Sequence, residues 1–337
     1  KDVAMNELLT VDSRQPTAVV RTVLGDIPAG EFGVCLPHEH IWCNQAMAPR
    51  AELFGATRDP ATYMRLDDEA RMVGELRAFR AAGGSSVVEV TCDGWGRDLE
   101  VLARLSAASD VHIVATAGFY IEPCMPSFVA AWSVERLADH LVAEIQEGVG
   151  PHRRRCGVLK SAIHRARVEG LELKGLLAVA QAQLRTGVAI TSHTTGTRRQ
   201  EIEGGNIGLQ QLEVLKAEGV DPRRFIVGHV DERPDLDVLA RLADEGCYIQ
   251  FDVIDKEMYL LDETRAELVV ALIERGYLRH LLLSHDRNRD HEMRYSGHTG
   301  YCHIAEDFLP RLRRLGVSDE QIRVMQVENP ARAFALG

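Results

Sequence analysis

The chain has 337 residues, of which 45% are hydrophobic and 26% are charged, and its formal net charge is −11 at pH 7. These ordinary globular values exclude a disordered chain, and the acidic balance excludes a simple nucleic-acid-binding protein, which needs a basic surface. No stretch approaches about 18 uninterrupted apolar residues, so the sequence predicts no membrane-spanning helix. The seven cysteines form no CxxC pair, and we interpret them as free thiols of a reducing, cytoplasmic compartment.

The start of the chain is set apart from the fold. It carries no cationic stretch followed by an apolar core, so we expect no signal peptide. Residues 1–18 are predicted to be an N-terminal extension, and residues 1–4, which precede Met5, are a candidate cloning remnant. Residues 19–337 are predicted to form a single domain, because no linker, low-complexity tract or change in composition interrupts them.

Eight short apolar runs, rich in β-branched residues, have the length of β-strands. In chain order they are residues 33–41, 86–91, 112–118, 157–160, 188–193, 225–229, 247–252 and 281–286. Between the runs lie segments of helical periodicity, of which 69–82, 171–185 and 209–218 are the clearest. The segment 42–68, between the first two runs, is predicted to be a long active-site loop.

Strand–helix alternation of this kind predicts parallel strands joined by crossover helices. Eight such units close into a (β/α)8 barrel, the TIM barrel of the α/β class. The alternative is an open doubly wound sheet, which would require a glycine-rich phosphate-binding loop after an early strand. The sequence has no such loop, so we predict the barrel.

Residues that bind metals stand at the ends of several predicted strands, and the active sites of barrels lie at the carboxyl ends of their strands. The residues concerned are His38 and His40 on the first strand, His193 on the fifth, His229 on the sixth and Asp286 on the eighth. One histidine at a strand end is more often structural, but four with an aspartate predict a metal site. Imidazole and carboxylate ligands suit Zn²⁺ best, and also Mn²⁺, Co²⁺ or Fe²⁺.

Lys160 ends the fourth run, within the sequence of a buried strand. An unpaired lysine is almost never fully buried, and burial lowers the pKa of the amine and makes it nucleophilic. We therefore expect CO₂ to carboxylate Lys160, giving a carbamate that can bridge two cations. The alternative is an ion pair with a nearby acid, either Glu89 or Asp252.

Two divalent cations can share a bridging hydroxide that is nucleophilic at neutral pH, while one of them polarises a carbonyl or phosphoryl oxygen. Asp286 would bind a metal and the hydroxide, then move the proton to the leaving group. Asp286 and Lys160 are therefore the predicted catalytic residues. His285 points the other way along its strand and is predicted to support the ligands, and His112, at the start of a strand, is predicted to be structural.

Three residues that follow strand ends are predicted to contact the substrate: Tyr120, Lys256 and Arg289. Arginine forks bind carboxylate, sulfonate or phosphate groups, and Arg287 and Arg294 lie in the same loop as Arg289. The alternative for the basic residues is ion pairing with neighbouring acids. These acids are Asp255, Glu257, Asp290 and Glu292. The alternative for Tyr120 is packing beneath its loop.

At these positions the sequence resembles the phosphotriesterase family of the amidohydrolase superfamily. Further similar stretches are residues 94–98, 208–212, 218–222 and 328–330, and the resemblance runs from about Val20 to Leu336. It implies a binuclear metal hydrolase with a carboxylated lysine. By position it implies that His38, His40 and Asp286 bind one metal, that His193 and His229 bind the other, and that Lys160 bridges them.

Departures from the family pattern bear on the substrate. Asp252 on the seventh strand is followed by Val253, where phosphotriesterases proper carry a histidine and quorum-type lactonases an arginine. Residues 250–256 and 287–301 instead resemble the phosphotriesterase homology and phosphotriesterase-related branch. The best-known bacterial member of that branch has Glu where this chain has Lys160. The loop 161–168 also departs from the usual run of the family.

We therefore expect a metal-dependent hydrolase of carboxylic esters, above all of a lactone with a polar or anionic group. The alternatives are an amidase on N-acyl amino acids or sulfonates and an organophosphate triesterase, which would use the same ligands. A degenerate barrel that only binds a small ligand is the non-enzymatic alternative, and the intact ligand set argues against it. The expected partner is a small-molecule substrate, with no nucleic acid and no membrane, and a homodimer is common in the family.

Overall fold

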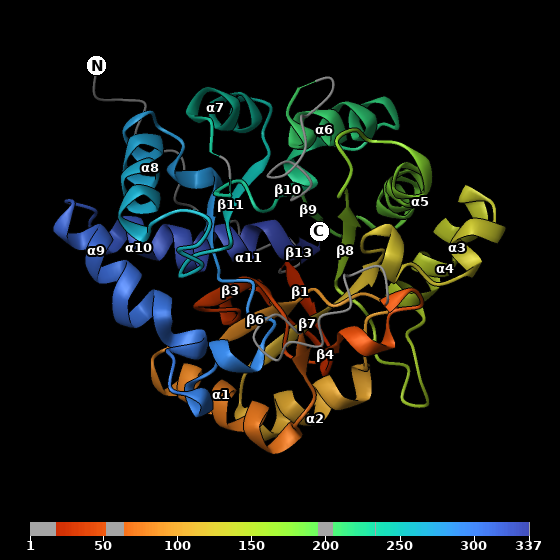
Figure 1. Cartoon of the computed structure of the whole chain (residues 1–337), viewed down its shortest axis with the longest axis horizontal. Helices are drawn as coiled ribbons and strands as arrows, with labels where there is room; N and C mark the ends of the chain where they lie inside the picture. Colours follow the sequence, from red (N-terminus) through yellow and green to blue (C-terminus); the bar gives the residue numbers. More distant parts are fainter. Residues whose placement is uncertain (1–17, 52–63, 195–204, 233, 337) are drawn as a thin grey trace.

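A computed structural model describes residues 18–51, 64–194, 205–232 and 234–336 (Figure 1). Its centre is a sheet of eight strands. These are β3 (Cys35–Glu39), β6 (Ser86–Glu89), β7 (His112–Gly118), β8 (Val158–Ala162), β9 (Ile190–His193), β10 (Phe225–Val227), β11 (Tyr248–Phe251) and β12 (Leu281–Leu283). Neighbouring strands follow one another in chain order and pair in parallel. The predicted barrel is confirmed, and each of its strands lies within one of the eight apolar runs or overlaps it.

Hydrogen bonds just beyond the first and last strands bring the two edges of the sheet together. The Asp286 N–H donates to the His38 carbonyl at 3.2 Å, and the His40 N–H donates to the Arg287 carbonyl at 3.2 Å. The His38 N–H also donates to the Ser284 hydroxyl oxygen, at 3.0 Å. These bonds draw the barrel nearly closed at its carboxyl end and hold two ligand-bearing segments side by side.

Helices surround the strands (Figure 1). They are α1 (Glu69–Ala81), α2 (Leu99–Ser109), α3 (Phe128–Ala131), α4 (Val134–Gln146), α5 (Gly170–Thr186), α6 (Ile207–Ala217), α7 (Leu236–Asp244), α8 (Asp262–Glu274), α9 (Leu309–Arg314), α10 (Asp319–Arg323) and α11 (Asn329–Phe334). Aspartate side chains cap α1, α2 and α7 by accepting backbone N–H bonds of the first turn. The three predicted helices are confirmed as α1, α5 and α6, with ends shifted by at most two residues.

The amino end of the barrel is closed by elements that the sequence did not predict. Strands β1 (Val19–Thr22), β2 (Gly25–Pro28) and β13 (Ala335–Leu336) form a small antiparallel sheet in which the two ends of the described chain meet. Beneath it, the rings of Phe32 and Phe334 lie 6.2 Å apart and pack against buried side chains of the strands. The interior of the barrel is therefore filled at this end, and its site can open only at the other.

Other expectations have different outcomes. The predicted loop 42–68 contains a short antiparallel pair, β4 (Cys43–Asn44) with β5 (Arg65–Leu66), while residues 52–63 lie outside the described part. The predicted extension, residues 1–18, lies outside it except for Ala18. All seven cysteines are free and buried, as expected. Among the described helices, none combines the length and the apolar character needed to cross a bilayer.

Candidate active site

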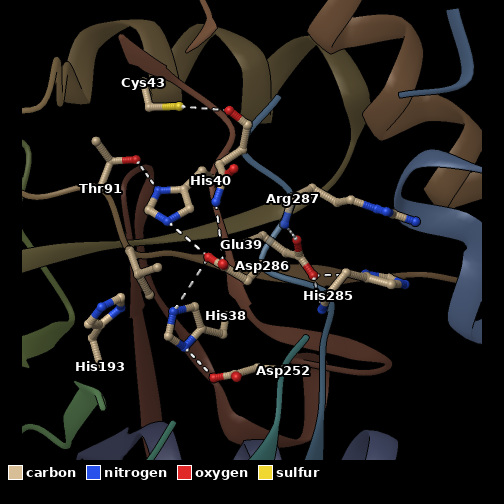
Figure 2. Close-up of polar contacts among 12 residues, drawn as sticks. His38, Glu39, His40, Cys43, Thr91, His193, Asp252, His285, Asp286 and Arg287 are labelled. Carbon is tan, nitrogen blue, oxygen red and sulfur yellow. Dashed lines mark hydrogen bonds and ion pairs between the residues drawn. The ribbon is translucent and has the colours of Figure 1, made fainter. Parts of the chain in front are cut away.

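The six predicted ligands all lie at the carboxyl end of the barrel and are buried or nearly so. They are His38, His40, Lys160, His193, His229 and Asp286. One ligand atom each from His38, His229 and Asp286 lies within 4.8 Å of the others. Figure 2 shows His38 and His40 turned toward the Asp286 carboxylate, with His193 beside them. The sheet has brought together residues that are up to 248 positions apart, from His38 to Asp286 (286 − 38).

Each of three imidazoles is held by the ring nitrogen that points away from the centre. Nδ1 of His38 lies 2.8 Å from Oδ2 of Asp252, and Nδ1 of His229 lies 2.7 Å from Oδ1 of the same carboxylate. Nδ1 of His40 lies 2.7 Å from Oγ1 of Thr91. Because the outer nitrogen is occupied in this way, Nε2 of each ring faces the other ligands, as in metal sites whose histidines are oriented by a second bond.

Thr91 sets the tautomer of His40. Its hydroxyl also contacts Oε1 of Glu89, whose pKa is raised by burial to about 7. When Glu89 is ionised its carboxylate only accepts, so the single hydroxyl proton goes to Glu89 and the Thr91 oxygen accepts a hydrogen bond from Nδ1–H of His40. This leaves a lone pair on Nε2 of His40, which lies 3.2 Å from Oδ1 of Asp286. The arrangement prepares Nε2 as a ligand atom.

Lys160 is 1% exposed, and its Nζ lies 2.9 Å from Nε2 of His38. Burial lowers the pKa of the amine. Within the described ranges no ion pair joins it to Glu89 or Asp252, the acids that we considered as alternative partners. A buried lysine amine facing an imidazole instead of an acid is a candidate for carboxylation, which remains a prediction.

His193 and His229 face one another, with Nδ1 of the first 2.8 Å from Nε2 of the second. Burial lowers the pKa of His193 well below its usual value. Burial has the same tendency at His229, but the Asp252 carboxylate outweighs it and raises the pKa of that ring. Two imidazole nitrogens at this distance share a proton, and both become available to a divalent metal once that proton is released.

The Asp286 carboxylate is fixed on both sides. In addition to His40 on Oδ1, the Lys256 ammonium lies 2.8 Å from Oδ2. Burial favours the neutral acid, but Lys256 and His40 outweigh it and hold the pKa of Asp286 well below its usual range. Asp286 and His229 both have a left-handed backbone, with φ of 55°, within three residues of the ends of their strands. Such strain is uncommon outside glycine and gathers at functional sites.

Taken together, the donor set fits divalent cations. Four imidazoles, a lysine amine and an ionised carboxylate converge in a buried space, and nitrogen faces nitrogen where His38 meets Lys160 and His193 meets His229. Imidazole and carboxylate are ligands that suit divalent cations once the protons shared between these nitrogens are released.

The predicted substrate contacts lie near this centre, and their partners are now visible. The Tyr120 ring stacks on Trp95 at 4.8 Å and meets the edge of His193, also at 4.8 Å. Lys256 pairs with Asp286, and Arg289 lies 3.4 Å from Glu292. Arg287 and Arg294, in the same loop, pair with Asp255 and Glu306. Arg287 and Arg289 thus form ion pairs with acids considered as their alternative partners, whereas the close partners of Lys256 and Arg294 are other acids. Contact of these residues with substrate remains a prediction.

Glu39 is a residue of the candidate site that the sequence argument missed. It lies between the two ligand histidines on the opposite face of β3 and is fully buried. Its carboxylate accepts bonds from the Ser284 hydroxyl at 2.7 Å and from the Arg287 N–H at 2.8 Å. It also lies 2.8 Å from Nδ1 of His285, so His285 supports the site as predicted instead of joining it (Figure 2). Burial raises the pKa of Glu39 to about 7.

His112, which we predicted to be structural, begins β7. It therefore lies at the amino end of the strands, away from the six predicted ligands. Within the described residues it has no part in the metal-ligand clusters.

Comparison with known proteins now places the chain. Residues 18–334 match the sequence model of the Phosphotriesterase family. The chain is 32% identical over 303 residues to the phosphotriesterase homology protein of Escherichia coli K12, covering 90% of this chain and 98% of that protein. It is 31% identical over 345 residues to the N-acetyltaurine hydrolase of Rattus norvegicus, covering 92% and 96%.

Solved structures agree with this. The crystal structure of the Escherichia coli phosphotriesterase homology protein, complexed with phosphate in its active site, is 32% identical and superimposes with a TM-score of 0.82 over 90% of this chain and 99% of that one. A lactonase from Listeria monocytogenes is 26% identical, with a TM-score of 0.83 over 94% and 98%. The chain therefore belongs to the phosphotriesterase family of binuclear metal hydrolases.

Proposed function

We propose that this protein uses two divalent metal ions, zinc in the first instance, to hydrolyse a carboxylic ester, with a lactone bearing a polar or anionic group as the leading substrate. The observation that carries the proposal is the convergence of His38, His229 and Asp286 ligand atoms within 4.8 Å at the open end of the barrel. The intact set of six ligand residues supports catalysis over a barrel that only binds a ligand.

The residues divide between two positions. His38, His40 and Asp286 would hold one cation, and His193 and His229 would hold the other. Lys160, carboxylated by CO₂, would bridge the two. When bound, the cations supply an activated water at neutral pH and polarise the carbonyl group of the substrate.

The chain itself supplies the proton transfer. Asp286 is ionised at neutral pH because Lys256 and His40 stabilise its charge, so its carboxylate can accept a proton from the attacking water. The same carboxylate then delivers that proton to the leaving group. Lys256 keeps Oδ2 in place at 2.8 Å, so Oδ1 is the oxygen directed toward the ligands. Tyr120 and Arg289 are the side chains we propose to contact the substrate.

A second candidate is hydrolysis of an N-acyl amine that ends in a sulfonate or carboxylate. The relatives named N-acetyltaurine hydrolase favour it, since they match more than nine-tenths of this chain in the rat, mouse and cattle proteins. Hydrolysis of organophosphate triesters is a third, weaker candidate. The seven buried thiols suit a reducing cytoplasmic location, and a homodimer is the assembly we expect.

The test is a comparison of substrates with the zinc-loaded protein: a series of lactones, N-acetyltaurine with N-acetyl amino acids, and paraoxon. We expect lactones to give the highest kcat/KM, and Asp286→Asn to lower it by about 100-fold or more. His112→Gln, which changes an imidazole at the closed end of the barrel, is the matched control and should keep full activity. Faster turnover of N-acetyltaurine would select the amidase, and no turnover by metal-loaded protein would indicate a binding barrel.

A further inference from the structure

A cavity of about 390 Å³ lies behind β3 on the flank of the barrel. It is bounded by the start of β3, the end of α1 and the C-terminal helical segment, which runs beside α1 in Figure 1. None of the six metal-ligand residues lines it. Its volume falls in the range of small-molecule binding sites, about 300–1,000 Å³.

The wall of this cavity is mostly apolar. Its main side chains are Val34, Leu36, Phe79, Ile304, Leu309 and Ile322. At the rim, Arg313 pairs with Asp319 at 2.8 Å and Arg323 with Glu320 at 2.9 Å, so the charges there are already balanced. The lining therefore suits an uncharged molecule with a large apolar part.

One polar group in the wall lacks a partner. Gln326 lines the cavity and is only 3% exposed, and its Nε2 has no hydrogen-bond partner among the described residues. A buried donor left without an acceptor is costly, because it has lost its hydrogen bonds to water. A ligand with a carbonyl oxygen would supply the missing acceptor.

The backbone around the cavity is also unusual. Two π-helical turns occur in the described chain, at Ile304–Phe308 and Val324–Glu328, and both border this cavity through Ala305 and Val327. Such turns are rare and are found frequently at functional sites. Gln326 itself lies in the second of these turns, and the first turn is an observation separate from it.

We propose that this cavity binds an uncharged, mainly apolar molecule with one carbonyl group, whose oxygen accepts a hydrogen bond from Nε2 of Gln326. The cavity is separate from the predicted metal centre, but residues that line it contact His40 and His285. Tyr301 lines the cavity and its hydroxyl donates to the His40 carbonyl at 2.6 Å. The N–H of Ile304 donates to Nε2 of His285 at 3.1 Å. The proposal does not depend on which substrate the metal centre hydrolyses.

Acetophenone and α-methylstyrene test the proposal, because they have the same shape but only the ketone has an acceptor. Titration calorimetry of the full chain should show saturable binding of both, with one site. Gln326→Met keeps the length of the side chain and removes the donor. This substitution should weaken the binding of acetophenone by about three- to tenfold and leave the affinity for α-methylstyrene unchanged. Equal effects on both ligands would overturn the role of Gln326.

Two further variants locate the ligand. Ala305→Phe adds a ring to the cavity wall and should abolish binding of both molecules, whereas Asp286→Asn at the metal centre should not alter it. Circular dichroism verifies that each variant is folded. If Ala305→Phe is unfolded, the comparison of the two ligands in Gln326→Met still tests the proposal. Absence of saturable binding to the wild type, or binding lost in Asp286→Asn but kept in Ala305→Phe, would overturn the proposal.

Discussion

The ammonium group of Lys256 lies 2.8 Å from Oδ2 of Asp286, and only 3% of this lysine is exposed. The pair sets the direction of a carboxylate that we expect to bind metal and carry the proton. The sequence argument predicted that Lys256 contacts the substrate, whereas this geometry favours a role in positioning Asp286. Kinetics can separate the two roles, because positioning affects kcat and substrate contact affects KM.

We expect Lys256→Met to lower kcat by about 10- to 100-fold, with a much smaller change in KM, because Asp286 loses the partner that orients it. Steady-state kinetics on the preferred substrate provide the measurement. Lys216→Met, which breaks an exposed pair with Glu245, is the matched control and should behave as wild type. A raised KM at unchanged kcat would instead restore Lys256 as a substrate contact.

Thr91→Val should weaken metal binding by about tenfold or more, because the isosteric valine cannot accept the hydrogen bond from Nδ1 of His40. Competition with a chromogenic chelator measures the affinity. Thr116→Val is the control, since that buried threonine lies on β7 and its hydroxyl lies beside the backbone carbonyls of Ala117 and Val158. Identical affinities for the two variants would show that Thr91 does not set the tautomer of His40.

Gly228, next to His229, leaves no room for a side chain. A Cβ there would lie 2.2 Å from the Ser192 carbonyl oxygen and 2.8 Å from Oδ2 of Asp252. We therefore expect Gly228→Ala to lower the free energy of unfolding by about 1–3 kcal/mol and to disturb the Asp252 carboxylate. Gly74→Ala, in α1 with open space around it, should stabilise by about 0.5–1 kcal/mol. Chemical denaturation compares the two, and equal stability of both variants would contradict the packing described.

The buried Glu75 carboxyl of α1 predicts a pH dependence of stability. Burial raises its pKa above the unfolded value of about 4.3, although the Tyr295 N–H donates to it at 3.1 Å. The folded state thus binds this proton more tightly, so the Glu75 contribution to stability falls as the pH rises through the folded pKa.

Glu75→Gln should therefore gain stability relative to wild type between pH 4.5 and pH 8, as followed by urea denaturation. Glu274→Gln, which replaces an exposed carboxylate of α8, is the control for the loss of a negative charge. A constant difference for Glu75→Gln would mean that its carboxyl is not destabilised by burial.

Much of the fold could be predicted because the strands of a parallel barrel are buried on both faces and read as apolar runs. Val87 and Val88 show this, since one packs in the outer layer and the other inside the barrel. The sheet of β1, β2 and β13 could not be predicted in the same way. Its strands have two to four residues, and Val19 pairs with Leu336 from the far end of the chain.

In the candidate site, too, some residues could be predicted from the sequence and others could not. The predicted ligands His193 and Asp286 stand at strand ends, where a barrel places its active site, so position and residue type were sufficient to select them as candidates. Supporting residues such as Thr91 and Glu39 have no distinctive spacing, and their roles depend on contacts across the barrel. The only signal for Glu39 was its place between two ligands, where alternation turns it to the opposite face.

The most direct test of the binuclear centre is the metal content of the purified protein, measured by elemental analysis for the wild type and for Lys160→Ala. Lys216→Ala, an exposed lysine, serves as the control. We expect about two divalent metal ions per chain in the wild type and the control, and one or fewer in Lys160→Ala, because the bridging group is lost. One metal or none in the wild type, or two in Lys160→Ala, would contradict a lysine-bridged pair of metals.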